Sequence, residues 1–97
     1  MKVKVRYFTT LRELAGSAEE EIELEVDASL ARLIARVAIA HGNAARDYLY
    51  HDDKADPSIY FLVNGKSAKV LSGLDTRLEE GDTVAIIPPI GGGRPYS

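Results

Sequence analysis

Three consecutive glycines, Gly91 to Gly93, follow the proline pair Pro88-Pro89 and form the segment with the most distinctive chemistry of the chain. Proline fixes φ and lacks a backbone N–H, so the pair directs the chain away from a strand along an extended path. Glycines carry no side chains, so the backbone after the prolines is slim enough to enter a narrow channel. The segment is not a phosphate-binding loop, because no Lys-Ser/Thr pair follows the glycines. On composition alone, a frayed tail is the simpler interpretation.

Metal and redox chemistry are restricted, because the chain has two histidines and no cysteine. The absence of cysteine excludes disulfides, thiolate metal sites and a cysteine nucleophile. His51 stands beside Asp52 and Asp53, but so few ligands favour a solvated loop over a metal site. His41 ends a predicted helix, where a positive charge suits the helix dipole. No Gly-x-Ser-x-Gly elbow occurs, so we expect neither a stand-alone enzyme site nor a cofactor bound by this chain.

The composition is that of a small globular domain. The 97 residues are 45% hydrophobic and carry a net charge of -3, which argues against a general nucleic-acid-binding protein. No apolar run has the length of a signal peptide core or a membrane span, so we expect a cytoplasmic protein that does not bind membranes. The acidic run at residues 19–25 is interpreted as a solvated strand face, with a basic partner as the alternative.

Alternating apolar residues predict two paired strands at the start of the chain, over residues 2–9 and 21–26. The cations of the first strand would lie opposite the glutamates of the second. Between the strands, Thr10 and Glu13 have the spacing of a capping box for a short helix that Gly16 would end. The side chains predicted to face inward are Val3, Val5, Tyr7, Ile22, Leu24 and Val26.

Apolar residues at helical spacing predict the main helix over residues 30–41. Ser29 is placed to cap its start and Gly42 to end it. A shorter helix is predicted over residues 44–50. The inward stripe of the main helix is Leu30, Leu33, Ile34 and Val37.

The second half of the chain contains three predicted strands, over residues 58–63, 67–70 and 83–87. The Asn64-Gly65 dipeptide is a strong hairpin signal between the first two. The segments without a strand pattern are predicted to be loops, turns or a short helix: residues 51–57, 71–78 and 80–82. This order predicts an α+β fold with a mixed sheet and one main helix packed on one face. Crossover handedness places the first and last strands centrally, as in a β-grasp. We expect residues 1–90 to form the domain and residues 91–97 to form a flexible tail.

The C-terminal segment LDTRLEEGDTVAIIPPIGGG, residues 74–93, resembles the C-terminal signature of the MoaD/ThiS family of ubiquitin-like sulfur carriers, whose members end in a GD-V---PP--GG pattern. The segment VRYFTTLRELAG, residues 5–16, is similar to the family's opening strand and helix. The resemblance covers about residues 2–93 and is nearest to the small subunit of molybdopterin synthase and its archaeal relatives. It implies a ubiquitin-like β-grasp fold.

The resemblance also implies a carrier function without catalysis by the chain itself. In the family, an adenylating enzyme related to the ubiquitin-activating enzymes uses ATP and Mg²⁺ to activate the terminal glycine carboxylate, and sulfur transfer then gives a thiocarboxylate. In molybdopterin synthase the tail enters the large subunit and donates sulfur to precursor Z. The PP--GG spacing maps the family's terminal glycines onto Gly92 and Gly93, so Gly93 is the expected acyl position.

The sequence departs from the family pattern after Gly93, because Arg94, Pro95, Tyr96 and Ser97 follow it. While they remain, Gly93 has no free carboxylate to be adenylated. Three hypotheses therefore stay open. The first is a sulfur carrier matured by a processing protease, and the second is a ubiquitin-like modifier conjugated to lysines through the same glycine. The third is an interaction module whose tail is never processed.

A docking surface for the partners is expected on the sheet face that the main helix leaves open. The notable apolar side chains there are Phe8, Tyr60, Leu62 and Ile87, with core positions as the alternative for some of them. Pro88, Pro89 and Gly91 continue this expected contact surface toward the glycines.

Overall fold

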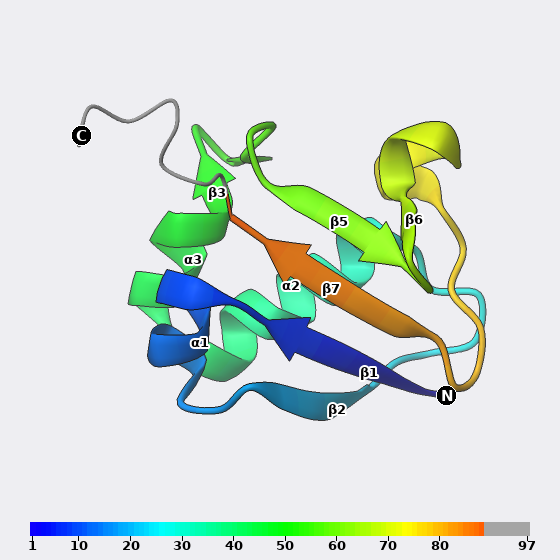
Figure 1. Cartoon of the computed structure of the whole chain (residues 1–97), viewed down its shortest axis with the longest axis horizontal. Helices are drawn as coiled ribbons and strands as arrows, with labels where there is room; N and C mark the ends of the chain where they lie inside the picture. Colours follow the sequence, from blue (N-terminus) through cyan, green and yellow to red (C-terminus); the bar gives the residue numbers. More distant parts are fainter. Residues whose placement is uncertain (89–97) are drawn as a thin grey trace.

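The first and last strands lie side by side at the middle of a mixed five-stranded sheet in the computed structural model, which describes residues 1–88 (Figure 1). Strand β1 (Lys2–Tyr7) pairs in parallel with β7 (Thr83–Ile87) and antiparallel with β2 (Glu19–Glu23). On the other side of β7, β5 (Tyr60–Val63) pairs antiparallel with both β7 and β6 (Lys66–Ser67). This order confirms the predicted ubiquitin-like β-grasp fold.

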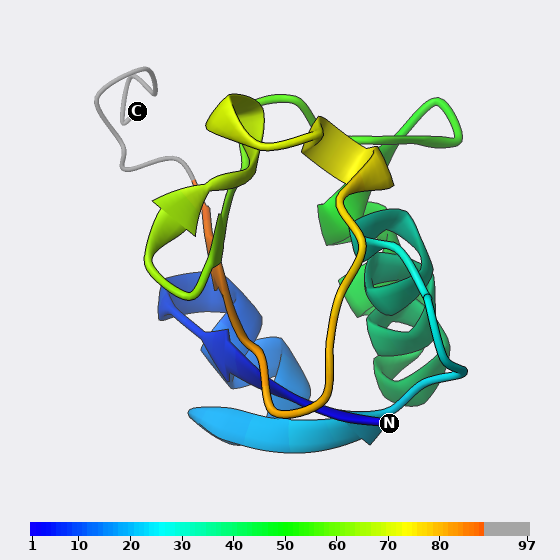
Figure 2. The same ribbon diagram turned by 90° about the vertical axis from the view of Figure 1, so that its right-hand side faces the viewer.

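The main helix, α2 (Leu30–His41), covers one face of this sheet (Figure 2). Its ends are those predicted: the Ser29 hydroxyl accepts a hydrogen bond from the backbone N–H of Arg32, and Gly42 follows the last turn. The apolar stripe of the helix is buried against the inward side chains of β1 and β7. The fully buried side chains at this interface include Val3, Val5, Leu30, Leu33, Val37, Val84 and Ile86.

Several details predicted for the first 30 residues are wrong. The first strand ends at Tyr7 and not at residue 9, and the second covers residues 19–23 and not 21–26. Helix α1 (Thr9–Ala15) begins one residue before Thr10, with Phe8 at the N-cap and no side-chain cap, so the capping box does not form. Gly16 ends the helix at a φ of 81°, as predicted. Val26 is 77% exposed, not inward, because β2 ends at Glu23 and the chain then turns through Asp27, which has a φ of 67°.

The segment after α2 contains more regular structure than the sequence predicts. Helix α3 (Asn43–Leu49) leads into a small hairpin of β3 (Tyr50–His51) and β4 (Lys54–Ala55), where a loop was predicted. The Asn64-Gly65 turn forms, but the strand after it ends at Ser67, whose hydroxyl accepts from the N–H of Lys69 and starts the 3₁₀ helix η1 (Ala68–Val70). A second 3₁₀ helix, η2 (Gly73–Asp75), follows. Among residues 1–88, no helix combines the length and apolarity that crossing a membrane requires.

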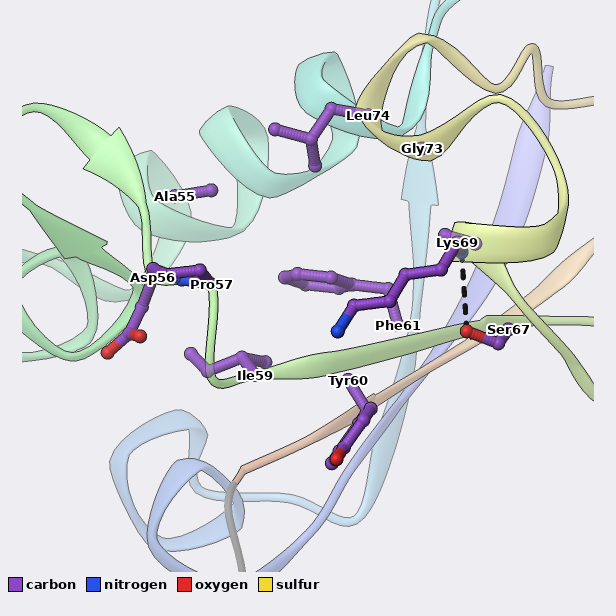
Figure 3. Close-up of a pocket in the computed structure, with 11 residues that line it drawn as sticks. Ala55, Asp56, Pro57, Ile59, Tyr60, Phe61, Ser67, Lys69, Gly73 and Leu74 are labelled. Atoms are coloured by element: carbon purple, nitrogen blue, oxygen red, sulfur yellow. Dashed lines mark hydrogen bonds between the residues drawn. The ribbon is translucent and has the colours of Figure 1, made fainter.

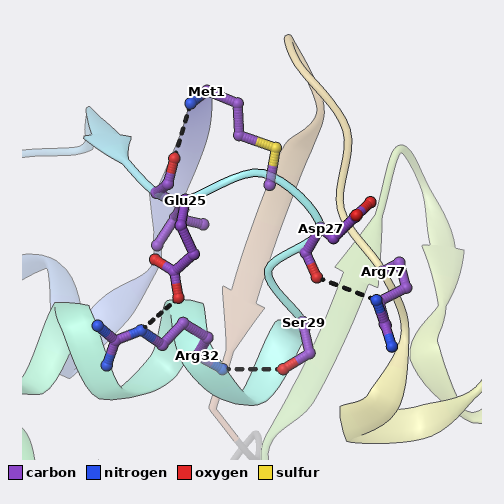
Figure 4. Close-up of polar contacts among 7 residues, drawn as sticks. Met1, Glu25, Asp27, Ser29, Arg32 and Arg77 are labelled. Carbon is purple, nitrogen blue, oxygen red and sulfur yellow. Dashed lines mark hydrogen bonds and ion pairs between the residues drawn. The ribbon is translucent and has the colours of Figure 1, made fainter.

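Polar contacts hold the crossing from β2 to the start of α2 (Figure 4). The N-terminal ammonium of Met1 donates to the carbonyl of Leu24 at 2.7 Å, and the guanidinium of Arg32 donates to the Glu25 carboxylate at 2.8 Å. The backbone N–H of Glu25 and the Arg32 guanidinium both lower the pKa of the Glu25 carboxyl. From the other side, Arg77 donates to the backbone carbonyl of Asp27 at 3.3 Å.

Candidate functional site

The carboxyl ends of β1 and β7 meet at one edge of the sheet, and the glycine-bearing tail continues from β7 at this edge. Because the two strands are parallel and Tyr7 pairs with Ile86, the next residues, Phe8 and Ile87, follow at the same level. Pro88, the last described residue, is buried. We call this place the tail-bearing edge. It contains the carboxyl end of β7, after which the sequence continues to the prolines and glycines (Figure 1).

The four apolar residues predicted for docking lie on the sheet face opposite α2. Tyr60 pairs with Ile87 across the β5–β7 ladder, and alternation places Leu62 on the same face as Tyr60. Tyr60 is 51% exposed, and Phe8, Leu62 and Ile87 are half-buried. We call these four residues the open-face patch. None of them belongs to the buried core, so the alternative of core positions is set aside.

Cations border the open-face patch at two places. The guanidinium of Arg6 lies 5.7 Å from the centre of the Phe8 ring, and the ammonium of Lys69 lies 5.5 Å from the centre of the Tyr60 ring. Both are within the range of a cation–π contact. Arg6 also pairs with Glu19 of the neighbouring strand at 3.8 Å. The surface is thus an apolar strip with a cationic rim, a composition suited to protein docking.

The remaining predicted site residues are Pro89, Gly91, Gly92 and Gly93, which lie outside the described residues. Their roles stay predictions. Among residues 1–88, no group of three or more His, Cys, Asp or Glu side chains is placed to hold a metal ion. His51 and Asp52 approach to 3.7 Å, and both are exposed.

A partly buried polar cluster of Tyr7, Glu20 and His41 was not predicted. The Tyr7 hydroxyl donates to Oε2 of Glu20 at 2.6 Å, and Nε2 of His41 lies 2.6 Å from the same oxygen. The rings of Tyr7 and His41 meet edge to face. Burial raises the pKa of the Tyr7 phenol, and Glu20 raises it further, so the phenol stays a neutral hydrogen-bond donor. The cluster links β1, β2 and the end of α2 on the sheet face that α2 covers.

The sequence did contain a signal for this cluster. Glu20 is opposite Val5 in the strand register and so shares its inward face, two positions before the buried Ile22. His41 follows the buried Val37 by four residues on the same face of α2. Because residues 19–25 were interpreted as one solvated acidic face, the inward position of Glu20 was missed. Glu19 and Glu21 are exposed, as predicted.

Comparison with known proteins finds relatives over nearly the whole chain. The model of the ThiS family matches residues 5–93. Small archaeal modifier protein 3 of Haloferax volcanii is 31% identical over 94 residues, covering 96% of this chain and 100% of the relative. The molybdopterin synthase sulfur carrier subunit of Chlamydomonas reinhardtii is 33% identical over 93 residues, covering 96% and 100%.

A solved structure shows the same arrangement of elements. The solution structure of small archaeal modifier protein 1 from Methanosarcina acetivorans superposes with a TM-score of 0.84 at 28% identity, covering 95% of this chain and 96% of the other.

Proposed function

Because this chain belongs to the ThiS family of ubiquitin-like sulfur carriers and modifiers, we propose that it carries sulfur on the carboxyl group of Gly93. The observation that carries the proposal is the extent of the family match, which includes the β-grasp domain and ends at Gly93. Gly93 is six residues beyond the end of β7, so it can extend at most about 20 Å from the sheet. That reach suits a tail that enters the active site of a partner while the domain stays outside.

The proposed chemistry takes place in the partners. The Gly93 carboxylate oxygen attacks the α-phosphorus of ATP on an adenylating enzyme that uses Mg²⁺, and pyrophosphate leaves. A sulfur donor then displaces AMP, which leaves a thiocarboxylate on Gly93. A carboxylate is a poor acyl donor until its oxygen becomes part of a good leaving group, so the adenylate step must come first.

We further propose that a processing protease removes residues 94–97 before activation. A peptide bond to Arg94 occupies the carbonyl carbon of Gly93, so the full chain offers no carboxylate there. The scissile bond joins Gly93 to Arg94, and neither residue is a proline. The glycine adds no side chain that a protease would have to accommodate.

Similarity to the Chlamydomonas protein supports molybdopterin synthesis as the pathway and the synthase large subunit as the partner that receives the tail. In this proposal the open-face patch binds the partner and the tail supplies the sulfur. Apolar and aromatic side chains surrounded by a polar rim are typical of protein interfaces.

The test compares three lengths of the chain, ending at Ser97, Gly93 and Gly92, with the adenylating enzyme, ATP and Mg²⁺. We expect pyrophosphate release and an acyl-adenylate with the chain that ends at Gly93. The chain that ends at Gly92 is the matched control for the position of the carboxylate. Gly93→Ala in the Gly93-ended chain adds one methyl group and should slow the reaction. Equal activation of the full chain, or no activation of any length, would contradict the processed-carrier proposal.

Conjugation to lysines is a second candidate function, favoured by the similarity to small archaeal modifier protein 3. Both functions need a mature end at Gly93, and they differ in the product. Intact-mass analysis of the protein from its native cell separates them, because a carrier shows an oxygen-to-sulfur exchange and a modifier shows an isopeptide adduct. A chain that keeps residues 94–97 and has neither product would instead be an interaction module.

A further inference from the structure

An apolar groove of two adjacent hollows lies at the β5 edge of the sheet, between the 3₁₀ helices and the β3–β4 hairpin. The first hollow has a volume of about 290 Å³, and its walls include Ile59, Phe61 and Leu74 (Figure 3). The second has a volume of about 430 Å³ and extends to Ile34 of α2. Ala55 and Leu74 line both hollows, so the two form one groove with Leu74 between them.

Exposed apolar side chains gather beside this groove. Six large hydrophobic residues of the described chain are exposed, and four of them lie on β5 or in the segment of the two 3₁₀ helices. The four are Tyr60, Val70, Leu71 and Leu74. A concentration of apolar surface around a formed hollow marks an interaction site more strongly than scattered single residues do.

The acidic side chains of the groove have partners within the domain. Asp53 lies 3.6 Å from the guanidinium of Arg46. The Asp56 carboxylate accepts hydrogen bonds from the backbone N–H and the hydroxyl of Ser58, at 2.9 and 2.7 Å. Each of these two carboxylates therefore has a local partner, although Asp53 is exposed.

The lysines of the groove are not paired in the same way. Lys69 lines the first hollow and Lys54 lines the second, and both are exposed. Within residues 1–88, neither lies within ion-pair distance of a carboxylate; the ammonium of Lys69 contacts the Tyr60 ring instead. The groove thus presents one available cation at each hollow, and a complementary ligand would carry carboxylates.

We propose that this groove binds a segment of another protein that presents two neighbouring apolar side chains flanked by Asp or Glu. The apolar side chains fill the two hollows on either side of Leu74, and the carboxylates pair with Lys54 and Lys69. Tyr60 of the open-face patch and Lys69 of its cationic rim also line the groove, whereas Phe8, Leu62 and Ile87 do not. The segment therefore binds next to the surface that we assign to the sulfur-transfer partners, at a site centred on Ala55 and Leu74.

Selection of peptides from a phage library of random dodecapeptides, with the full chain as bait, tests the proposal without assuming a sequence. We expect enriched peptides with a net negative charge and at least two apolar residues. Their amide shift perturbations on the labelled protein should centre on Ala55, Lys69 and Leu74. Enriched peptides that are neutral or basic, or perturbations centred on Phe8 and Ile87, would overturn it, as would no enrichment above an empty surface.

Variants then locate the binding. Leu74→Glu should weaken binding of an enriched peptide about tenfold or more, because it places a charge between the hollows. The matched control is Ile39→Glu, the same kind of change at an α2 residue that is 73% exposed and lies outside the groove.

Reversal of both lysines, Lys54→Glu with Lys69→Glu, should also weaken binding about tenfold and reduce its salt dependence. Equal affinity of the wild type and the lysine variant contradicts the charge match, and a concentration-dependent dimer lost in Leu74→Glu would assign the groove to a second copy of the chain.

Discussion

Removal of the Tyr7 hydroxyl tests the contribution of the partly buried hydrogen bond between Tyr7 and Glu20. Tyr7 is 1% exposed, and its hydroxyl lies 2.6 Å from a carboxylate oxygen. We expect Tyr7→Phe to lower the free energy of unfolding by about 1.5–3 kcal/mol, the range for a hydrogen bond to a charged group. Urea unfolding measures this change. Tyr60→Phe is the matched control, because its ring is half exposed, and it should leave stability within about 0.5 kcal/mol.

The same phenol predicts a dependence of stability on alkaline pH. The folded state raises the pKa of Tyr7, chiefly by burial, above the value of about 10 for a tyrosine in an unfolded chain. A group with a raised pKa contributes stability that is fully present below its unfolded pKa and is lost as the pH rises toward the folded value. The wild type should therefore lose more stability than Tyr7→Phe above about pH 10. Ultraviolet titration should show one tyrosine that ionises after the others, and this last step should be absent from Tyr7→Phe; a step that persists would assign it to another tyrosine.

For single residues, the sequence patterns predicted whether a side chain faces inward better than they predicted which residue it contacts. Alternation correctly placed Tyr7 inward, but it does not say which polar group meets an inward hydroxyl. Glu20 and His41 come from two other elements, so their meeting with Tyr7 depends on how β2 and α2 pack. The prediction that Val26 faces inward failed for a related reason. The alternation of apolar residues in the sequence continues to Val26, but strand β2 ends at Glu23.

At the scale of elements, α2 supplies the largest part of the helical layer that covers the sheet. Leu33 is fully buried at the centre of its stripe. Leu33→Ala should lower the free energy of unfolding by about 2–5 kcal/mol, because it removes buried methyl groups and leaves a cavity. Urea unfolding at neutral pH measures it. The exposed Ile39 of the same helix provides the control, since Ile39→Ala removes apolar groups that already contact water; equal losses at both positions would mean that the buried face of α2 is misassigned.

Elements with local end signals were predictable to the residue, and those made by pairing were not. The bounds of α2 follow from the Ser29 cap and Gly42, and those of β7 from the turn at Gly81 and the prolines after it. The β3–β4 hairpin consists of two-residue strands whose alternation is too short to detect. Its turn residues Asp52 and Asp53 adopt positive φ values, which a turn without glycine does not predict.

At the scale of the whole molecule, the open-face patch should govern how tightly the domain binds its sulfur-transfer partners. We expect Phe8→Ala to weaken binding to the adenylating enzyme or the synthase large subunit by more than about 1 kcal/mol. Because Phe8 is half-buried and outside the core cluster, stability should change little. Calorimetric titration gives the affinity, and thermal unfolding gives the stability. Val26→Ala, at an exposed position outside the patch, is the control. A large loss of stability with unchanged affinity would instead assign Phe8 a role in folding.

The patch itself was predictable because register and alternation decide which side chains share a sheet face. The two-hollow groove was not predictable, since its walls include residues of α2, β4, β5 and η2, which only the tertiary structure brings together. A site on one sheet face can thus be inferred from the periodicity of the sequence. A site between the helices and the sheet can be inferred only when the packing of these layers is known.

The parallel pairing of β1 with β7 has a consequence for the order in which the protein is made. The backbone N–H of Lys2 donates a hydrogen bond to the carboxylate of Glu80, 78 positions away in the sequence. The residue pairs between β1 and β7 have a similar separation. Contacts this distant in sequence form slowly, because the loop between them must close first. During synthesis, β1 cannot take its central place until β7 has left the ribosome. A nascent chain would therefore offer no finished sheet face to a partner before the residues that lead into the tail exist, so binding surface and tail reach completion together.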